Sequence, residues 1–269
     1  IYFFVLSKLS LPRRECRRLS PGPAARPMLQ HCFGALVVAA LGPRTAEFLA
    51  AHPAFRESDV LLTSAKGLVG NPLADHAFAL LLALTRRVAT AVRMGPESWN
   101  HRRELRLVET ELDGQIMGII GLGGTGRALG RRAVGFGMHC IAVDRDKVPA
   151  APEVNDVWGL DRLDELLEIA DVVAVCCPLT EETHNLISER ELKLMKPSAY
   201  LVNVTRGEII DTDALVEALT SGEIAGAGLD VTPEEPLPAD HALWQLDNVV
   251  MTPHSAGASQ ERAGRGIDR

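Results

Sequence analysis

The sequence contains no apolar run long enough to cross a lipid bilayer. Its first residues, IYFFVLSKL, also lack the basic n-region and the small-residue cleavage site of a secretory signal peptide. We therefore expect a protein that is neither inserted in a membrane nor exported.

Positive charge is not in excess either. The chain has 28 Lys and Arg residues against 35 Asp and Glu residues, which gives a formal net charge of −7 at pH 7. This balance provides no broad basic field for nucleic acid or for an acidic membrane surface. The charge therefore favours a small molecule as the binding partner.

The cysteines match no metal-binding or disulfide framework. They are an odd number, and none of them belongs to a CxxC pair: Cys16, Cys32, Cys140, Cys176 and Cys177. Such a set argues against both a disulfide scaffold and a zinc site. We expect no bound metal and a reducing compartment, the cytoplasm.

Two motifs of other nucleotide-dependent enzymes are missing. The sequence has no GxxxxGK[ST] phosphate loop, and neither Tyr2 nor Tyr200 is followed four residues later by the lysine of a YxxxK pair. The first absence argues against a P-loop nucleotidase. The second argues against a short-chain dehydrogenase.

From residue 115 onward, short β-rich runs alternate with amphipathic segments. The β-rich runs are QIMGII, HCIAV, DVVAVCC, AYLVNV, AGAGLDV and NVVMT. Helical segments such as LDELLEIA and DALVEALTSG lie between them, and Gly222 stands where the second of these should end. Because parallel strands can be joined only by crossovers, the alternation predicts an α/β fold with a mostly parallel sheet covered on both faces.

An earlier segment, PLADHAFALLLALTRRVATAVRM, predicts one extended helix from Pro72 to Met94. Its proline stands at a plausible first helical position, and a long apolar face follows. His76 on this helix is interpreted as a structural residue.

A glycine motif follows the first β-rich run. Gly121, Gly123 and Gly126 form a GxGxxG pattern between that run and a helical segment, as in loops that bind a dinucleotide pyrophosphate. Asp144 ends the next run, 18 residues after Gly126, where a carboxylate would bind the adenosine ribose and disfavour a 2′-phosphate. The pattern favours NAD over NADP, although Arg145 argues the other way and Asp144 could be an ordinary turn residue.

Three later stretches place reactive groups at the ends of predicted strands. NVTRGEIID contains Arg206, GLDVTPEEPLP contains Glu234 and Glu235, and TPHSAG contains His254. An arginine suits a carboxylate substrate, and a histidine oriented by a glutamate suits proton transfer near neutral pH. The alternative for His254 is a polar residue at a strand end with one backbone hydrogen bond.

From about Phe55 to Gly257 the chain resembles the D-isomer-specific 2-hydroxyacid dehydrogenases. The resemblance rests on the order and spacing of GLGGTG, Asp144, CCPLTEETHNLI, LVNVTRGEIID, GLDVTPEEPLP and TPHSAG. It implies NAD-dependent interconversion of a small D-2-hydroxy acid and its 2-oxo acid. By resemblance Arg206 binds the substrate carboxylate, Glu235 pairs with the histidine, and His254 is the acid–base residue.

The resemblance also implies further cofactor contacts. Asp230 would hold the nicotinamide carboxamide and Thr183 would contact the cofactor, with Cys177 and Pro178 lining the adenine side; the remaining implied contacts are Gly124, Thr125 and Thr205. The family's fold is a Rossmann doubly wound parallel sheet with a smaller flavodoxin-like substrate domain. We expect the substrate domain at residues 1–93, with a return segment at 255–269, and the NAD-binding domain at residues 94–254. Pairing through the long helix would give a homodimer.

The chain departs from the family pattern before about Phe55. The glycine-containing substrate loop of the family, which reads like GAGVDN, has no counterpart in CFGALVVAALGPRTAEFLAAHPAF. The substrate domain therefore looks incomplete, although Lys66 and Gly67 resume the pattern. An NAD-binding regulatory protein, or a catalytically impaired fragment of the same fold, is the alternative function.

Overall fold

A computed structural model describes residues 3–7, 36–40, 61–64, 69–146, 148–149 and 151–259. The chain divides into two compact units, Ile1–Leu68 with Arg265–Arg269, and Val69–Gly264. In the first unit, strand β2 (Leu36–Ala40) pairs antiparallel with β1 (Phe3–Ser7) and parallel with β3 (Leu61–Ser64). The other features expected of a flavodoxin-like domain, including the segment of Lys66 and Gly67, lie outside the described residues.

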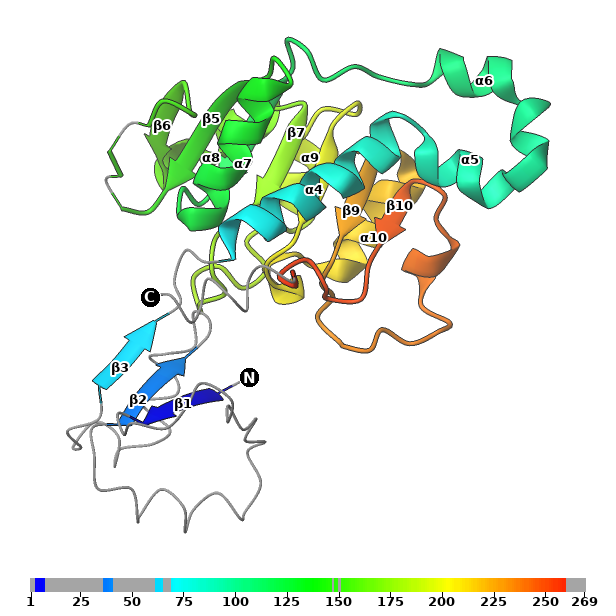
Figure 1. Cartoon of the computed structure of the whole chain (residues 1–269). Helices are drawn as coiled ribbons and strands as arrows, with labels where there is room; N and C mark the ends of the chain where they lie inside the picture. The colour runs from blue at the N-terminus through cyan, green and yellow to red at the C-terminus, as the bar shows by residue number, and fades with distance from the viewer. Residues whose placement is uncertain are drawn as a thin grey trace. The chain divides into compact units, whose positions relative to one another are not determined.

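The second unit is built on a seven-stranded sheet in which every pair of neighbours is parallel (Figure 1). The strand order is β10-β9-β8-β7-β4-β5-β6. The chain first places β5 and β6 on one side of β4 and then returns to place β7 to β10 on the other side, so the strand order reverses between β4 and β7. This arrangement confirms the predicted Rossmann fold. The strands are β4 (Ile116–Ile120), β5 (His139–Asp144), β6 (Asp156–Gly159), β7 (Val172–Val175), β8 (Tyr200–Asn203), β9 (Gly226–Leu229) and β10 (Val249–Met251).

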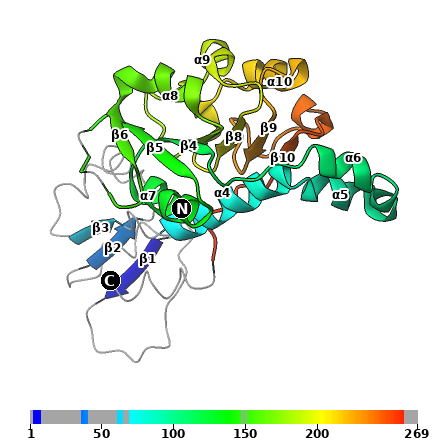
Figure 2. The same ribbon diagram turned by 90° about the horizontal axis from the view of Figure 1, so that it is seen from above.

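Helices cover both faces of this sheet. On one face lie α4 (Gly70–Thr85) and α7 (Gly124–Gly135), and on the other lie α8 (Leu163–Ile169), α9 (Glu189–Leu194) and α10 (Thr212–Ser221) (Figure 2). Two apolar cores result, one beneath each helical layer. The central strands β7 and β8 are buried on both sides, which explains why their sequences are continuous apolar runs instead of alternating ones.

Local signals in the sequence fix the ends of α10. The Asp211 carboxylate accepts hydrogen bonds from the backbone amides of Asp213 and Ala214 at the N-terminus. Gly222 ends the helix in the left-handed conformation, with φ of 78°, as predicted.

The prediction of one helix from Pro72 to Met94 is wrong. The structure has two helices, α4 and α5 (Val88–Met94), separated at Arg87, whose φ is 52°. The cause is a long-range contact: the carbonyl oxygen of Thr85 accepts a hydrogen bond of 2.9 Å from the Thr110 amide, so it does not continue the helical ladder. The apolar pattern alone gives no sign of this contact.

Helix α4 belongs to the second unit, whereas the boundary expected from the sequence, between residues 93 and 94, assigned it to the first. Its buried residues, including Ala77, Phe78 and Leu81, share one core with Met117 and Val202 of the sheet. Residues 255–259 of the expected return segment also lie in the second unit, and residues 260–269 lie outside the described residues.

A helical excursion leaves this unit on the side of β10 (Figures 1 and 2). It consists of α5, the 3₁₀ helix η1 (Gly95–Trp99) and α6 (Arg102–Leu107), none of which contains a buried residue. Large apolar side chains are exposed along it, namely Val88, Val92, Trp99, Leu107 and Val108. Over the described ranges, none of the helices has both the length and the apolar character needed to cross a membrane.

Candidate active site

The glycine loop that follows β4 requires its glycines. A Cβ atom on Gly126 would lie 2.3 Å from the carbonyl oxygen of Gly121, and one on Gly121 would lie 2.8 Å from the Cα of Cys177. Gly121 also has a φ of 98°, which side chains rarely adopt. Gly123, by contrast, faces open space and precedes the first turn of α7. The loop therefore packs tightly against the protein on one side and leaves a helix N-terminus open on the other, which fits a pyrophosphate.

Asp144 ties this loop to the end of β5. Its Oδ2 atom accepts a hydrogen bond of 2.7 Å from the Leu122 amide, and its Oδ1 atom accepts one of 3.0 Å from the Asp146 amide. The carboxylate is thus held beside the glycine loop. This is the arrangement in which an acidic residue can reach the ribose of a dinucleotide.

The loop after β7 lies against the glycine loop, at the point where the strand order reverses. Burial raises the pKa of the Cys177 thiol to about 11, and desolvation also raises the pKa of Cys176. Both thiols therefore stay protonated at neutral pH and contribute packing, since the thiolate is the reactive form.

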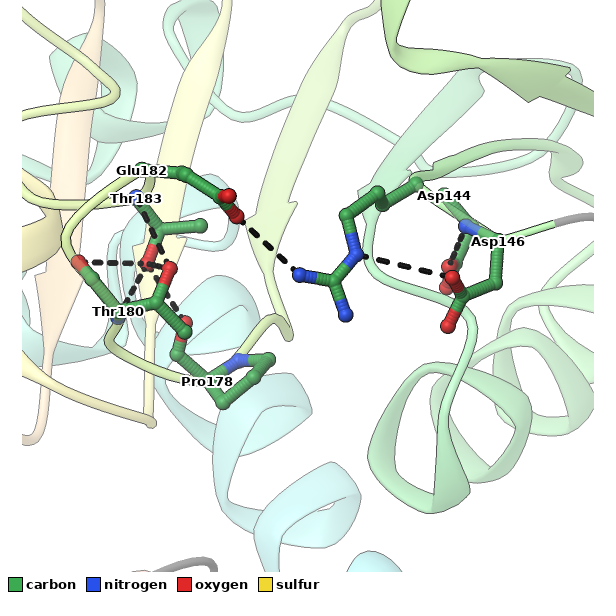
Figure 3. Close-up of polar contacts among 7 residues, drawn as sticks. Asp144, Asp146, Pro178, Thr180, Glu182 and Thr183 are labelled. Atoms are coloured by element: carbon green, nitrogen blue, oxygen red, sulfur yellow. Dashed lines mark hydrogen bonds and ion pairs between the residues drawn. The ribbon is translucent and has the colours of Figure 1, made fainter.

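Farther along this loop, the Thr183 hydroxyl donates a 2.7 Å hydrogen bond to the Pro178 carbonyl and accepts one of 2.7 Å from the Thr180 amide (Figure 3).

Arg145 directly follows the end of β5 and pairs with a residue of this second loop. Its Nη1 atom donates a 3.1 Å hydrogen bond to Oε2 of Glu182, and its Nε atom lies 3.6 Å from Oδ1 of Asp146. The Arg145 guanidinium therefore interacts with two carboxylates, those of Glu182 and Asp146.

His254 and Glu235 meet at the other end of the site region. Nδ1 of His254 lies 2.7 Å from Oε2 of Glu235, while Oε1 of Glu235 accepts a 3.3 Å hydrogen bond from the Thr232 amide. The His254 side chain is 46% exposed. The neighbouring Glu234 contributes its backbone carbonyl to the Thr232 hydroxyl instead.

Asp230 holds the backbone on which His254 stands. Its carboxylate is 1% exposed; Oδ1 accepts from the Thr252 hydroxyl at 2.7 Å and from the Ser255 amide at 2.9 Å, and Oδ2 accepts from the Ala256 amide at 2.9 Å. Its carbonyl accepts a 2.7 Å bond from the amide of His254, whose φ is 50°. Both carboxylate oxygens thus bind the histidine loop, and the contact with the nicotinamide that the family resemblance implies stays a prediction.

Arg206 lies on a turn that Asn203 organises. The buried Asn203 amide donates to the Arg206 carbonyl at 2.8 Å and accepts from the Thr205 amide at 3.0 Å. The next residue, Gly207, packs so closely on Thr232 that an added Cβ would lie 2.0 Å from its carbonyl carbon. The turn is therefore pressed against the segment that leads to Glu235. Within the described ranges, the Arg206 guanidinium contacts the Thr205 carbonyl and has no carboxylate partner.

His76 was not identified as a site residue from the sequence. Its Nε2 atom lies 2.7 Å from the Thr252 hydroxyl and 3.4 Å from Oδ1 of Asp230. Its partner Thr252 is 176 positions away, so no local pattern signals the contact.

Asn203 was also not identified from the sequence, although it could have been, because its hydrogen bonds to Thr205 and Arg206 are local. In the part of the chain that the structure describes, no three His, Cys, Asp or Glu side chains are placed to hold a metal.

Comparison with protein families gives one match that covers most of the chain. Residues 78–256 match the profile described as D-isomer specific 2-hydroxyacid dehydrogenase, NAD binding domain. The matched segment includes the second half of α4, in agreement with the place of this helix in the second unit. It also contains the glycine loop, Asp144, Arg206, Glu235 and His254.

Individual relatives point to the same family. A glyoxylate reductase of Thermococcus litoralis is 43% identical over 209 residues, which are 75% of this chain and 62% of that protein. The chain thus spans less than two thirds of the length of this curated relative.

Among solved structures, the apo form of Rhodotorula graminis D-mandelate dehydrogenase is 31% identical, with a TM-score of 0.76 over 86% of this chain and 68% of that one. An acyclic imino acid reductase in complex with NADPH and D-Arg is 27% identical, with a TM-score of 0.67 over 80% of this chain and 67% of that one. Similar folds are therefore known with the phosphorylated cofactor.

Proposed function

The chain belongs to the D-isomer-specific 2-hydroxyacid dehydrogenase family, and we propose that it acts as an NAD-dependent oxidoreductase on a small D-2-hydroxy acid and its 2-oxo acid. The 2.7 Å contact between Nδ1 of His254 and Oε2 of Glu235 is the observation that carries this proposal. It joins the two groups that acid–base chemistry at a carbonyl requires. We propose that the Val69–Gly264 unit binds the cofactor and that the Ile1–Leu68 unit is the counterpart of the substrate domain.

The cofactor would be held at the carboxyl ends of β4, β5 and β7. The backbone of the glycine loop from Gly121 to Gly126 would bind the pyrophosphate, and Asp144 would accept hydrogen bonds from the adenosine ribose. Thr183 and Thr205 would contact the rest of the dinucleotide. A bound nicotinamide donates or accepts the hydride at the substrate carbon.

His254 would carry the proton that accompanies this transfer. In the reductive direction the protonated imidazole donates to the carbonyl oxygen of the 2-oxo acid, and in the oxidative direction the neutral imidazole accepts the hydroxyl proton. Glu235 at Nδ1 keeps the second nitrogen free for the substrate and stabilises the imidazolium. The Asp230 carboxylate fixes the loop through the Ser255 and Ala256 amides, so the imidazole needs little reorientation.

Arg206 would bind the substrate carboxylate. A guanidinium can donate two parallel hydrogen bonds to a carboxylate and can also polarise an adjacent carbonyl oxygen. The turn organised by Asn203 places this side chain on the segment packed against Thr232. Such packing supports a binding role, because it limits the motion of the backbone under the guanidinium.

The test is NADH oxidation by the purified chain over a panel of 2-oxo acids, with analysis of the configuration of the product. Formation of a D-2-hydroxy acid is expected. NADH binding without turnover of any acid would instead support the alternative, an NAD-binding regulatory or catalytically impaired protein.

The exposed helical excursion supports a second proposal, that two copies of the chain form a homodimer. Val92 is 74% exposed, and Trp99 and Leu107 are each 77% exposed, although all three lie on a short stretch of chain. Monomeric proteins rarely leave so many large apolar side chains in water along one segment. A second copy of the same segment would cover them in a symmetric interface.

A further inference from the structure

We propose that Glu182 is a specificity-determining residue, which withholds the Arg145 guanidinium from the 2′-phosphate of NADP. The inference rests on the cofactor site proposed above. It concerns a residue, on the loop after β7, to which the sequence patterns assign no role.

The end of β5 carries two residues with opposite preferences. Asp144 is the residue type that accepts hydrogen bonds from the 2′-hydroxyl of NAD, and an arginine nearby is the type that accommodates the 2′-phosphate of NADP. Arg145 follows Asp144 directly. Cofactor choice therefore depends on what the Arg145 guanidinium binds when no phosphate is present.

The structure gives that guanidinium two protein partners. Glu182 accepts the 3.1 Å hydrogen bond from Nη1, and Asp146 lies 3.6 Å from Nε on the other side (Figure 3). Two carboxylates thus interact with one cation, and the adjacent Asp144 adds a third negative charge, so the four residues together carry a net charge of two negatives. A 2′-phosphate would have to break the pair with Glu182 and enter a negative field.

The loop that carries Glu182 is locally ordered. The adjacent Thr183 is bonded to Pro178 and Thr180, and its own amide donates to the Thr180 carbonyl at 3.3 Å. Glu182 therefore lies on a turn that is held by hydrogen bonds of its neighbour Thr183. The pair itself is open to water, since the Arg145 and Glu182 side chains are 64% and 72% exposed. Exposed ion pairs shift equilibria by factors of up to about five.

The test compares nucleotide binding by charge-matched variants of the full chain. In Glu182→Gln, NADPH should bind about fivefold more tightly, because Arg145 is released and one negative charge is removed, while NADH affinity should change less than about twofold. The control is Glu181→Gln, which makes the same change one residue away; in the described structure Arg145 pairs with Glu182 and Asp146, not with Glu181. Dissociation constants come from titration of nucleotide fluorescence at fixed salt.

The second arm removes the arginine. Arg145→Gln alone should leave NADPH affinity nearly unchanged, whereas Arg145→Gln combined with Glu182→Gln should abolish the gain of the single glutamate variant. The proposal is overturned if Glu181→Gln raises NADPH affinity as much as Glu182→Gln does, or if the gain persists without Arg145. An unmodified chain that binds neither nucleotide would overturn the cofactor site as well. Normal NADH binding with no response to Glu182→Gln would overturn this inference alone.

Discussion

Nε2 of His76, in helix α4, lies 2.7 Å from the hydroxyl oxygen of Thr252, two residues before His254. The same hydroxyl donates to Oδ1 of the buried Asp230. Helix α4, the end of β9 and the loop after β10 are therefore joined through one carboxylate. The loop that carries His254 is therefore held by this buried network as well as by the contact with Glu235.

Asp230→Asn should lower the free energy of unfolding by about 1–3 kcal/mol. The amide replaces an acceptor oxygen with an NH₂ group, so at least one donor among Thr252, Ser255 and Ala256 loses its buried partner. Urea denaturation followed by circular dichroism measures the change. Asp240→Asn, at an exposed position, is the control and should shift the midpoint little. Equal effects of the two substitutions would contradict the assigned role of Asp230.

A homodimer should be found at micromolar concentration. Replacing Val92 and Leu107 with Ser or Asn should yield monomers without unfolding the sheet, because neither side chain is buried within the chain. Light scattering measures the mass, and circular dichroism checks the fold. A monomer mass for the unmodified chain would contradict the proposal.

Stability should fall between about pH 9 and pH 11, in part because of Cys177. Burial raises the pKa of this thiol from 9.0 in the unfolded chain to about 11 in the folded one. Below pH 9 the thiol is protonated in both the folded and the unfolded state, so its contribution to the free energy of unfolding is fully present. Above pH 9 the thiol ionises first in the unfolded chain, which favours unfolding. The loss approaches about 2–3 kcal/mol once pH exceeds the folded value. In Cys177→Ala, urea titrations over this pH range should show a smaller decline; an identical decline would contradict the assignment.

The sheet was predictable because its strands have the residue pattern that parallel pairing imposes. Runs such as IMGII and VVAV are apolar throughout, since helices cover both faces. Strand β6, Asp156–Gly159, was missed: it is a short edge strand that begins and ends with exposed residues. The break at Arg87 was missed because its cause, the bond between Thr85 and Thr110, is a contact between distant segments.

Site residues could be proposed from the sequence where chemistry requires fixed spacing along the chain. The glycines and Asp144 occur at intervals set by one βαβ unit, so they could be identified without a structure. The contacts of His76 with Thr252 and of Arg145 with Glu182 could not, because the partners lie 176 and 37 positions away and meet only after folding. Motif spacing thus identified the groups proposed to bind and react, but not those that hold them in place.

Glu235→Gln should lower kcat/KM for reduction of the 2-oxo acid. The carboxylate 2.7 Å from Nδ1 orients the imidazole, and a neutral amide makes a weaker hydrogen bond to it. The second nitrogen of His254 then faces the substrate less often, so proton transfer slows. The measurement is kcat/KM for the 2-oxo acid at a fixed pH. Glu234→Gln is the matched control, because the Glu234 contact in the structure is through its carbonyl; a loss of equal size in that variant would contradict the pairing.

His254→Asn should reduce turnover on the order of 10²-fold or more, because the reaction loses its proposed general acid. NADH affinity should remain nearly unchanged, since the proposed cofactor contacts are made by the glycine loop and Asp144. Turnover is measured at saturating NADH, and binding is measured by fluorescence titration. Asn retains the side-chain polarity, and its backbone tolerates the positive φ of 50° found at this position better than most residues. A loss of turnover can therefore be assigned to the imidazole, whereas unchanged turnover would reduce His254 to a polar residue at the end of a strand.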